Sequence, residues 1–314
     1  MLSRTADNLY WLGRYFERAE NTARMLDVAH RSALISREEV AQADWGSVLA
    51  ISGTAQGFSG KHTRTDARSV ITWMVFDLDN FSSVASCLRR ARENGRALRG
   101  SITSEMWESL NETYLSLQGK TYEDVVAGGT SPFFDWVKER SHLFRGVTFG
   151  TMLRDDCYHF LRLGTFLERA DNTARLLDVK YHMLLPRPDQ VGGVVDFYQW
   201  AALLRSVSAL RAYKRLYREA VLPWRVAELL ILREDMPRSL RASFREIDVL
   251  FGELRQRYHT DYECFRVAGE IYAKLRYGRM DDIFQTGLHE FLTDFIRRCA
   301  SLGKQIADDF QLAA

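Results

Sequence analysis

Apolar residues recur every three or four positions along most of the chain, which is the spacing that the buried face of an α-helix requires. One such stripe begins at Leu9 and ends at Leu26, and a second begins at Phe160 and ends at Leu177. Alanines occupy the middle positions of both stripes, and such small side chains let helices approach closely. Because no segment alternates apolar and polar residues convincingly, the pattern predicts an all-α fold.

Caps and prolines mark the ends of several further helices. Ser36 begins a capping box, Ser131 precedes a proline at a predicted helix start, and Pro186 ends a helix. The apolar spacing then predicts helices at about residues 64–77, 82–99, 104–118, 194–218, 223–233, 238–257, 262–277 and 281–310.

A twelve-residue sequence occurs twice in the chain. Residues 17–28 read ERAENTARMLDV and residues 168–179 read ERADNTARLLDV, so ten of the twelve positions are identical at an offset of 151. Weaker matches continue at offsets of 151 to 156, as loops of different length would cause. A repeat this long indicates a duplicated subdomain rather than a solenoid. We therefore expect two helical halves, residues 1–150 and 151–314, packed about a pseudo-twofold axis into one bundle.

The repeated segment carries a set of polar residues beside its apolar stripe. They are Glu17, Arg18, Asn21 and Arg24 in the first copy, and Glu168, Arg169, Asn172 and Arg175 in the second. One interpretation is exposed ion pairs within each helix, such as Glu20 with Arg24 and its counterpart, which stabilise little. A second is a partly buried network that fixes the register of the helices, and a third is a ligand-binding or active site. We expect both repeated glutamates to be buried and bound by arginines.

A second group of charged residues forms an arginine stripe in the first half only. Its members, spaced by three, four and three residues, are Arg89, Arg92, Arg96 and Arg99. At an offset of 156 the second half has Arg245, Asp248, Gly252 and Arg255. Guanidinium groups suit phosphates and carboxylates, so this stripe is a candidate site for an anion or an acidic partner. Pairing with the chain's own carboxylates is the alternative, and nucleic acid is disfavoured because aromatic residues do not interleave.

Composition narrows the classes of function further. The chain has 43 Lys and Arg against 41 Asp and Glu, a net charge of +2, so it exerts no general attraction on nucleic acid or anionic membranes. Its four cysteines lack metal-binding spacing and fit reduced thiols in the cytoplasm. No stretch reaches ~18 apolar residues, and we expect neither a membrane-spanning helix nor a signal peptide.

Known catalytic and metal-binding motifs are incomplete in this sequence. Glu139 and His142 have the Glu-x-x-His spacing of di-iron bundles, and Asp156 with His159 is a weaker case. These two motifs are not separated by the offset of the repeat. Tyr114 stands where the first glycine of a phosphate-binding loop would be needed. We therefore predict no catalytic residue, no metal and no cofactor.

The ER dipeptides in ERAENTAR and ERADNTAR, together with the Arg-rich segment 89–96, resemble the alpha-E family, a helical domain with an ER motif. The resemblance covers essentially the whole chain. It implies a bacterial protein that occurs beside circularly permuted ATP-grasp enzymes and transglutaminase-like proteins, in a setting of ATP-dependent amide-bond formation. The alpha-E protein's own role in that setting is unassigned.

Three hypotheses about function follow. The leading one is a non-catalytic helical accessory protein that binds an ATP-grasp amidoligase, or that enzyme's peptide substrate, through a polar Glu/Arg groove. The second is an enzyme of the same pathway in which Glu17 or Glu168 acts as a general base and arginines hold a carboxylate or phosphate. The third is a structural protein that forms a homodimer.

Overall fold

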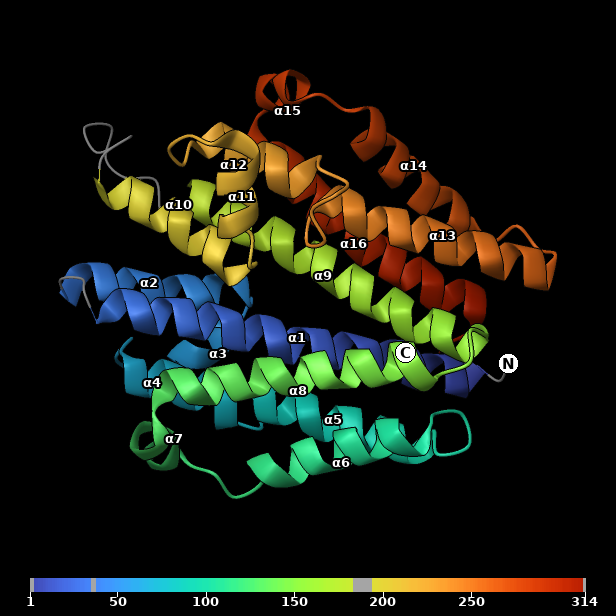
Figure 1. Cartoon of the computed structure of the whole chain (residues 1–314), viewed down its shortest axis with the longest axis horizontal. Coiled ribbons are helices and arrows are strands. Elements are labelled where there is room, and N and C mark those ends of the chain that lie inside the picture. Colours follow the sequence, from blue (N-terminus) through green and yellow to red (C-terminus); the bar gives the residue numbers. More distant parts are fainter. Residues whose placement is uncertain (1–2, 35–37, 183–193, 313–314) are drawn as a thin grey trace. The chain divides into compact units, whose positions relative to one another are not determined.

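The computed structural model describes residues 3–34, 38–182 and 194–312, and within these ranges every regular element is a helix (Figure 1). The predicted all-α fold is confirmed. The predicted capping box at Ser36 and the predicted helix end at Pro186 lie outside the described residues.

The first ten α-helices and one π-helical turn, in chain order, are α1 (Ser3–Ala33), α2 (Glu38–Ile51), α3 (Ala55–Ser59), α4 (Ala67–Ile71), the π-helix η1 (Thr72–Phe76), α5 (Val84–Ala97), α6 (Ser104–Leu117), α7 (Tyr122–Gly128), α8 (Thr130–Thr151), α9 (Asp156–His182) and α10 (Val194–Ser206). The rest are α11 (Leu210–Tyr217), α12 (Pro223–Ile231), α13 (Leu240–Tyr258), α14 (Glu263–Tyr277), α15 (Met280–Thr286) and α16 (Leu288–Phe310).

The described chain divides into two compact units, one ending at Glu168 and the other covering residues 169–312. The division falls inside α9, so the first part of this helix belongs to the first unit. The duplication of the chain and its division at residues 150 and 151 stay predictions.

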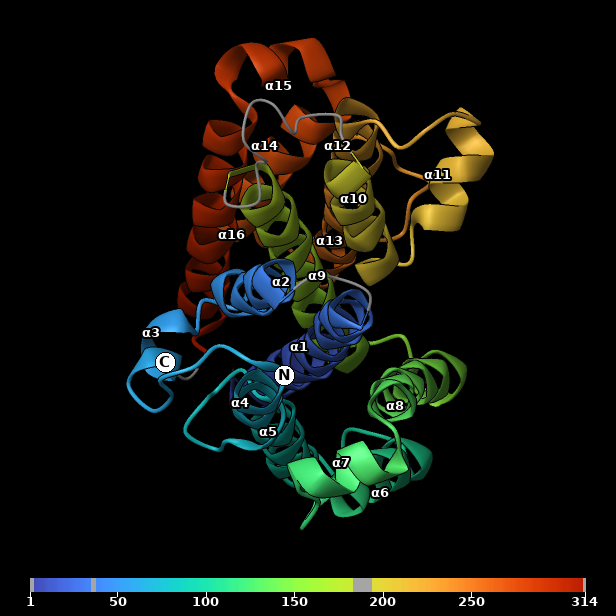
Figure 2. The same ribbon diagram turned by 90° about the vertical axis from the view of Figure 1, so that its left-hand side faces the viewer.

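The first unit is built around α1. Both α1 and α6 pack against α5 and against α8, so these four helices enclose a core (Figure 2). The apolar stripe from Leu9 to Leu26 is buried there, as its spacing predicts. Phe16 on α1 stacks on Phe144 of α8, with ring centroids 4.1 Å apart. Burial of such large side chains is the main force that holds this bundle together.

Two glycines let α1 approach the first part of α9. A Cβ atom on Gly13 would lie 2.1 Å from the carbonyl oxygen of Leu161, and one on Gly164 would lie 1.9 Å from the carbonyl oxygen of Tyr10. These distances are far below van der Waals contact, so only glycine fits at either place. The two contacts correspond to each other in the sequence repeat. Gly13 and Gly164 are 151 residues apart, and so are Tyr10 and Leu161, whose carbonyl oxygens they face.

In the second unit, α13, α14 and α16 pack together. Phe244 on α13 contacts Phe295 on α16 edge to face, with ring centroids 5.4 Å apart. A buried ion pair joins the last part of α9 to α10, with Lys180 Nζ 3.1 Å from Asp196 Oδ1. The second unit therefore buries charged as well as apolar side chains.

Backbone conformation corrects three predicted helix boundaries. The predicted helix 194–218 is two helices, because Ser208 between them has a positive φ of 56°. The predicted last helix is interrupted in the same way at Gly287, where φ is 97°. The helix predicted to follow Ser131 begins at Thr130, directly after Gly129 with φ of 92°. A positive φ is left-handed backbone, which a right-handed helix cannot contain.

Candidate functional site

The second ER dipeptide places Glu168 against two arginines of α1. Arg18 donates from Nε to Oε1 over 2.6 Å and from Nη2 to Oε2 over 2.9 Å. Arg14 donates from Nε to Oε2 over 2.8 Å. The Arg18 pairing is bidentate, which is the strong geometry for a guanidinium and a carboxylate. The site thus joins a residue of one repeated segment to a residue of the other.

Burial and charge act in opposite directions on Glu168. Burial by itself raises the pKa of this carboxyl, but the charges and hydrogen bonds of Arg18 and Arg14 outweigh it and hold the pKa at about 2. Glu168 is therefore ionised at neutral pH, and both of its oxygens accept hydrogen bonds from guanidinium groups.

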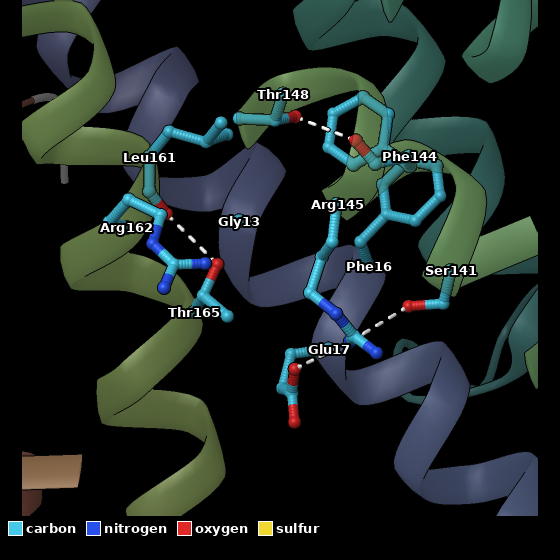
Figure 3. Close-up of a pocket in the computed structure, with 10 residues that line it drawn as sticks. All are labelled: Gly13, Phe16, Glu17, Ser141, Phe144, Arg145, Thr148, Leu161, Arg162 and Thr165. Atoms are coloured by element: carbon cyan, nitrogen blue, oxygen red, sulfur yellow. Dashed lines mark hydrogen bonds and ion pairs between the residues drawn. The ribbon is translucent and has the colours of Figure 1, made fainter. Parts of the chain in front are cut away.

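The first repeated segment places two further carboxylates in the interior, Glu17 and Glu20, which are 1% and 0% exposed. Arg145 of α8 reaches both: its Nη1 lies 3.2 Å from Glu17 Oε2 and also donates to Glu20 Oε2 (Figure 3 draws its contacts with Glu17 and Ser141). Ser141 Oγ donates to Glu20 Oε2 over 2.8 Å, and Arg24 Nε donates to Glu20 Oε1 over 2.8 Å. The predicted buried network therefore exists around these glutamates, and it ties α1 to α8.

A small hollow lies beside this network, bounded by α1, α8 and the first part of α9 (Figure 3). Its polar lining residues are Glu17, Ser141, Arg145, Thr148, Arg162 and Thr165. The space open to a water-sized sphere is about 10 Å³, which is the room that one buried water molecule needs. The hollow therefore accommodates water rather than a substrate-sized molecule.

The other residues predicted from the repeat differ in burial. Asn21 and Arg169 are buried, whereas Asn172 and Arg175 are partly exposed. Arg175 Nε donates to Asp171 Oδ2 over 2.8 Å, one turn earlier on α9. The local ion pairs predicted from i,i+4 spacing are therefore present in both copies.

The arginine stripe lies on α5, and α6 packs beside it. Arg92 donates from Nε to Asn111 Oδ1 over 2.8 Å, and its guanidinium carbon lies 4.9 Å from the ring centroid of Tyr114. Arg99 lies just beyond the end of α5, and its guanidinium carbon is 4.5 Å from the ring centroid of Trp107. Arg96, between them on the helix, is exposed. We call these five side chains, Arg92, Arg96, Arg99, Trp107 and Tyr114, the arginine surface.

Among the described residues, no carboxylate neutralises the stripe. Throughout the ranges that the structure describes, no Asp or Glu lies within ion-pair distance of Arg89, Arg92, Arg96 or Arg99. The Nε atom of Arg89 is buried without a hydrogen-bond partner there. The alternative that internal carboxylates pair with the stripe, for which the sequence offered Asp77, Asp79 and Glu17, is therefore wrong.

The matching arginines of the second half behave differently. Arg245 Nε lies 3.2 Å from Glu234 Oε1, and Arg255 Nε lies 2.7 Å from Asp261 Oδ1. Both of these pairs lie within the second unit. The two stripes therefore differ in charge balance, and only the first leaves guanidinium groups to meet an anion from outside.

Sequence reasoning missed Arg14, Arg145 and Ser141. Arg14 precedes Arg18 by one helical turn, so i,i+4 spacing places both arginines on one face of α1, but their contact with Glu168 depends on the packing of α1 on α9. Arg145 and Ser141 are 128 and 121 residues from the glutamates that they contact, and no local pattern links them. Their role follows only from the packing of α8 on α1.

A larger groove of about 520 Å³ lies where α6, α7 and α8 meet, lined on its aromatic side by Phe133 and Trp136. None of the predicted site residues lines it. Of its charged residues, Asp124 accepts the hydrogen bonds that cap α7 through Thr121, and both Asp124 and Lys120 are exposed.

The sequence predicts neither a metal site nor a membrane-spanning helix. Within the described ranges, no group of three or more His, Cys, Asp or Glu side chains is arranged to hold a metal ion. His142, half of the Glu-x-x-His pair, instead places Nε2 3.2 Å from Nη2 of Arg24. None of the described helices is both long and apolar enough to cross a membrane.

Comparison with known proteins gives one match. The family model named alpha-E, described as a predicted alpha-helical domain with a conserved ER motif, matches residues 1–310. Neither a curated protein nor a solved structure matches the chain.

Proposed function

We propose a function from one premise: the chain belongs to the alpha-E family. In this proposal it is a non-catalytic helical accessory protein that acts with an ATP-grasp amidoligase in peptide or amide-bond synthesis. It binds the ligase, or an acidic ligand of that enzyme, through its Glu/Arg region. A transglutaminase-like protein is the second partner in the proposal.

The non-catalytic assignment rests on the hydrogen bonds and ion pairs that the buried carboxylates already make with arginines. A general base needs a free lone pair within reach of a substrate proton and a pKa near the working pH. Glu168 does not fit this role, because it is buried, arginines donate to both of its oxygens, and its pKa is held at about 2. Glu17 borders a hollow with room for one water molecule. These facts favour an accessory role over the enzyme hypothesis for this region.

In the same proposal the two groups of polar residues have separate tasks. The buried glutamates and their arginines position α1 against α8 and the first part of α9. The arginine surface on α5 and α6 provides the contact with a partner, because its charges are not neutralised by described carboxylates. The partner contact thus lies on the outside of a bundle that the ER network holds in shape.

The test is a reconstitution with an ATP-grasp amidoligase from the same organism. We expect the two purified proteins to form a complex in size-exclusion chromatography with light scattering. We also expect the chain alone to release no ADP from ATP and form no amide product, and to raise the product yield when added to the ligase.

Two results would contradict the proposal. One is the absence of a complex together with an unchanged product yield. The other is turnover by the chain alone that is abolished in Glu17→Gln, provided that this variant is folded by circular dichroism. Asp171→Asn is the matched control, since it removes a carboxylate of the repeat that is partly exposed.

A further inference from the structure

The arginine surface combines three charges with two aromatic rings on neighbouring helices. The two helices pack against each other, and Leu110 of α6 lies directly over Gly95 of α5. The helices therefore lie close enough for Arg92 and Arg99 to reach the rings of α6. Stacking on an aromatic ring restricts a guanidinium group while leaving its N–H edge free to donate.

Arg92 is the most restricted of the three. Its Nε donates to Asn111 Oδ1 and its guanidinium carbon lies 4.9 Å from the ring centroid of Tyr114, so the Nη groups remain as donors. Arg96 lies one turn further along α5 and is exposed. Arginines at this spacing repel one another unless anions lie between them, which favours a ligand that carries several negative charges.

The shape and charge of the surface favour a protein segment as that ligand. Arg92, Arg96 and Arg99 follow one another along α5 and just beyond its end, and such a row suits an extended chain. Glu93 and Glu108 are exposed on the same two helices and oppose the continuous charge of a nucleic-acid backbone. A peptide with separated carboxylates can place each one at a guanidinium group and avoid these glutamates.

We propose that the arginine surface binds an acidic segment of a partner protein, whose Asp and Glu carboxylates are held by the N–H groups of Arg92, Arg96 and Arg99 above Trp107 and Tyr114. This inference rests on the proposed function, since it specifies the chemistry of the partner contact. Two exposed arginines of the second unit, Arg245 and Arg255, serve as an internal control, because they are paired with Glu234 and Asp261.

The probe is a fluorescein-labelled decamer in which glutamate alternates with serine, titrated with the full chain at low and at moderate salt and followed by fluorescence anisotropy. We expect saturable binding that weakens with salt, as contacts between exposed charges do. The double variant Arg96→Ala, Arg99→Ala should raise Kd about tenfold or more, a loss of about 1.4 kcal/mol for each factor of ten. Both residues lie at the surface, and an unchanged thermal melt confirms that the variant is folded.

The matched control is Arg245→Ala, Arg255→Ala, which removes the same number of charges and should leave Kd within about twofold of the parent. Arg92→Lys keeps the charge but loses the planar fork, and it should weaken binding measurably. The inference is overturned if the decamer does not bind, if both double variants lose affinity equally, or if Arg92→Lys binds like the parent. It is also overturned if a ten-nucleotide single strand binds more tightly and is lost with the same variants.

The inference and the proposed function can fail separately. If the decamer binds as expected but the ATP-grasp protein forms no complex, the proposed function fails and the acidic-segment surface stands. If the complex forms but neither Arg96→Ala, Arg99→Ala nor excess decamer affects it, the inference fails alone.

Discussion

Arg18 and Glu168 are 150 residues apart in the sequence and form a bidentate ion pair, with Nε and Nη2 of the arginine 2.6 and 2.9 Å from the two carboxylate oxygens. The arginine comes from the first ER dipeptide and the glutamate from the second. The pair therefore joins the two repeated segments across the contact of α1 with α9, close to the crossing of Gly13 and Gly164. A buried pair of this kind is costly to break, because the remaining charge keeps its desolvation penalty without its partner.

Glu168→Gln is expected to lower the free energy of unfolding by about 3–5 kcal/mol. The substitution keeps the size of the side chain but leaves the guanidinium groups of Arg14 and Arg18 without their carboxylate. Urea unfolding at pH 7, followed by circular dichroism, measures the change. Asp171→Asn removes a partly exposed carboxylate of the same helix and should cost at most about 1 kcal/mol. Equal losses in the two variants would show that the ER pair has no special structural role.

The stabilisation by Glu168 should depend on pH in a defined range. Its pKa is about 2 in the folded protein against an ordinary value of 4.5, so the unfolded state takes up the proton first as the pH falls. The contribution is therefore fully present above about pH 4.5 and is lost as the pH falls through about 2. The difference in unfolding free energy between the parent and Glu168→Gln should shrink between pH 5 and pH 2, and a constant difference would disprove this assignment.

Gly13→Ala and Gly164→Ala should each destabilise the protein by about 1–3 kcal/mol, because the added methyl group overlaps a backbone oxygen of the facing helix. This loss opposes the gain of up to about 1 kcal/mol that alanine brings to a helix. Gly146→Ala is the matched control, since a Cβ atom there meets nothing within 4 Å, and it should be neutral or stabilising. Thermal melts of the three variants measure these changes in stability. Stabilisation by all three substitutions would mean that α1 and α9 do not approach closely.

Arg145 and Glu20 should show strong energetic coupling. Arg145→Met leaves two buried carboxylates without this cation, whereas the double variant Arg145→Met, Glu20→Gln also removes one of those charges. We expect the double variant to lose less unfolding free energy than the sum of the single variants, by about 1 kcal/mol or more. A double-mutant cycle by urea unfolding measures the coupling, and additive losses would contradict the contact.

The sequence by itself determined the helical class of this protein and its local ion pairs. The three-and-four spacing of apolar residues predicts helices because the geometry of one helix is enough to bring those residues to one face. Glu20 with Arg24, and Asp171 with Arg175, were predictable for the same reason. The left-handed residues Ser208 and Gly287, which divide two predicted helices, left no such periodic signal.

Only the tertiary structure decided which charges meet across the bundle. Arg145 comes to Glu17 and Glu20, and Arg14 and Arg18 come to Glu168, because helices distant in sequence pack together at positions that no local spacing specifies. The same packing placed the arginine surface beside the rings of α6 while bringing no described carboxylate to it. Helix formation depends on neighbours three or four residues away. Which helices come together depends on the burial of apolar faces along the whole chain, and this packing selects the partner of each charged side chain.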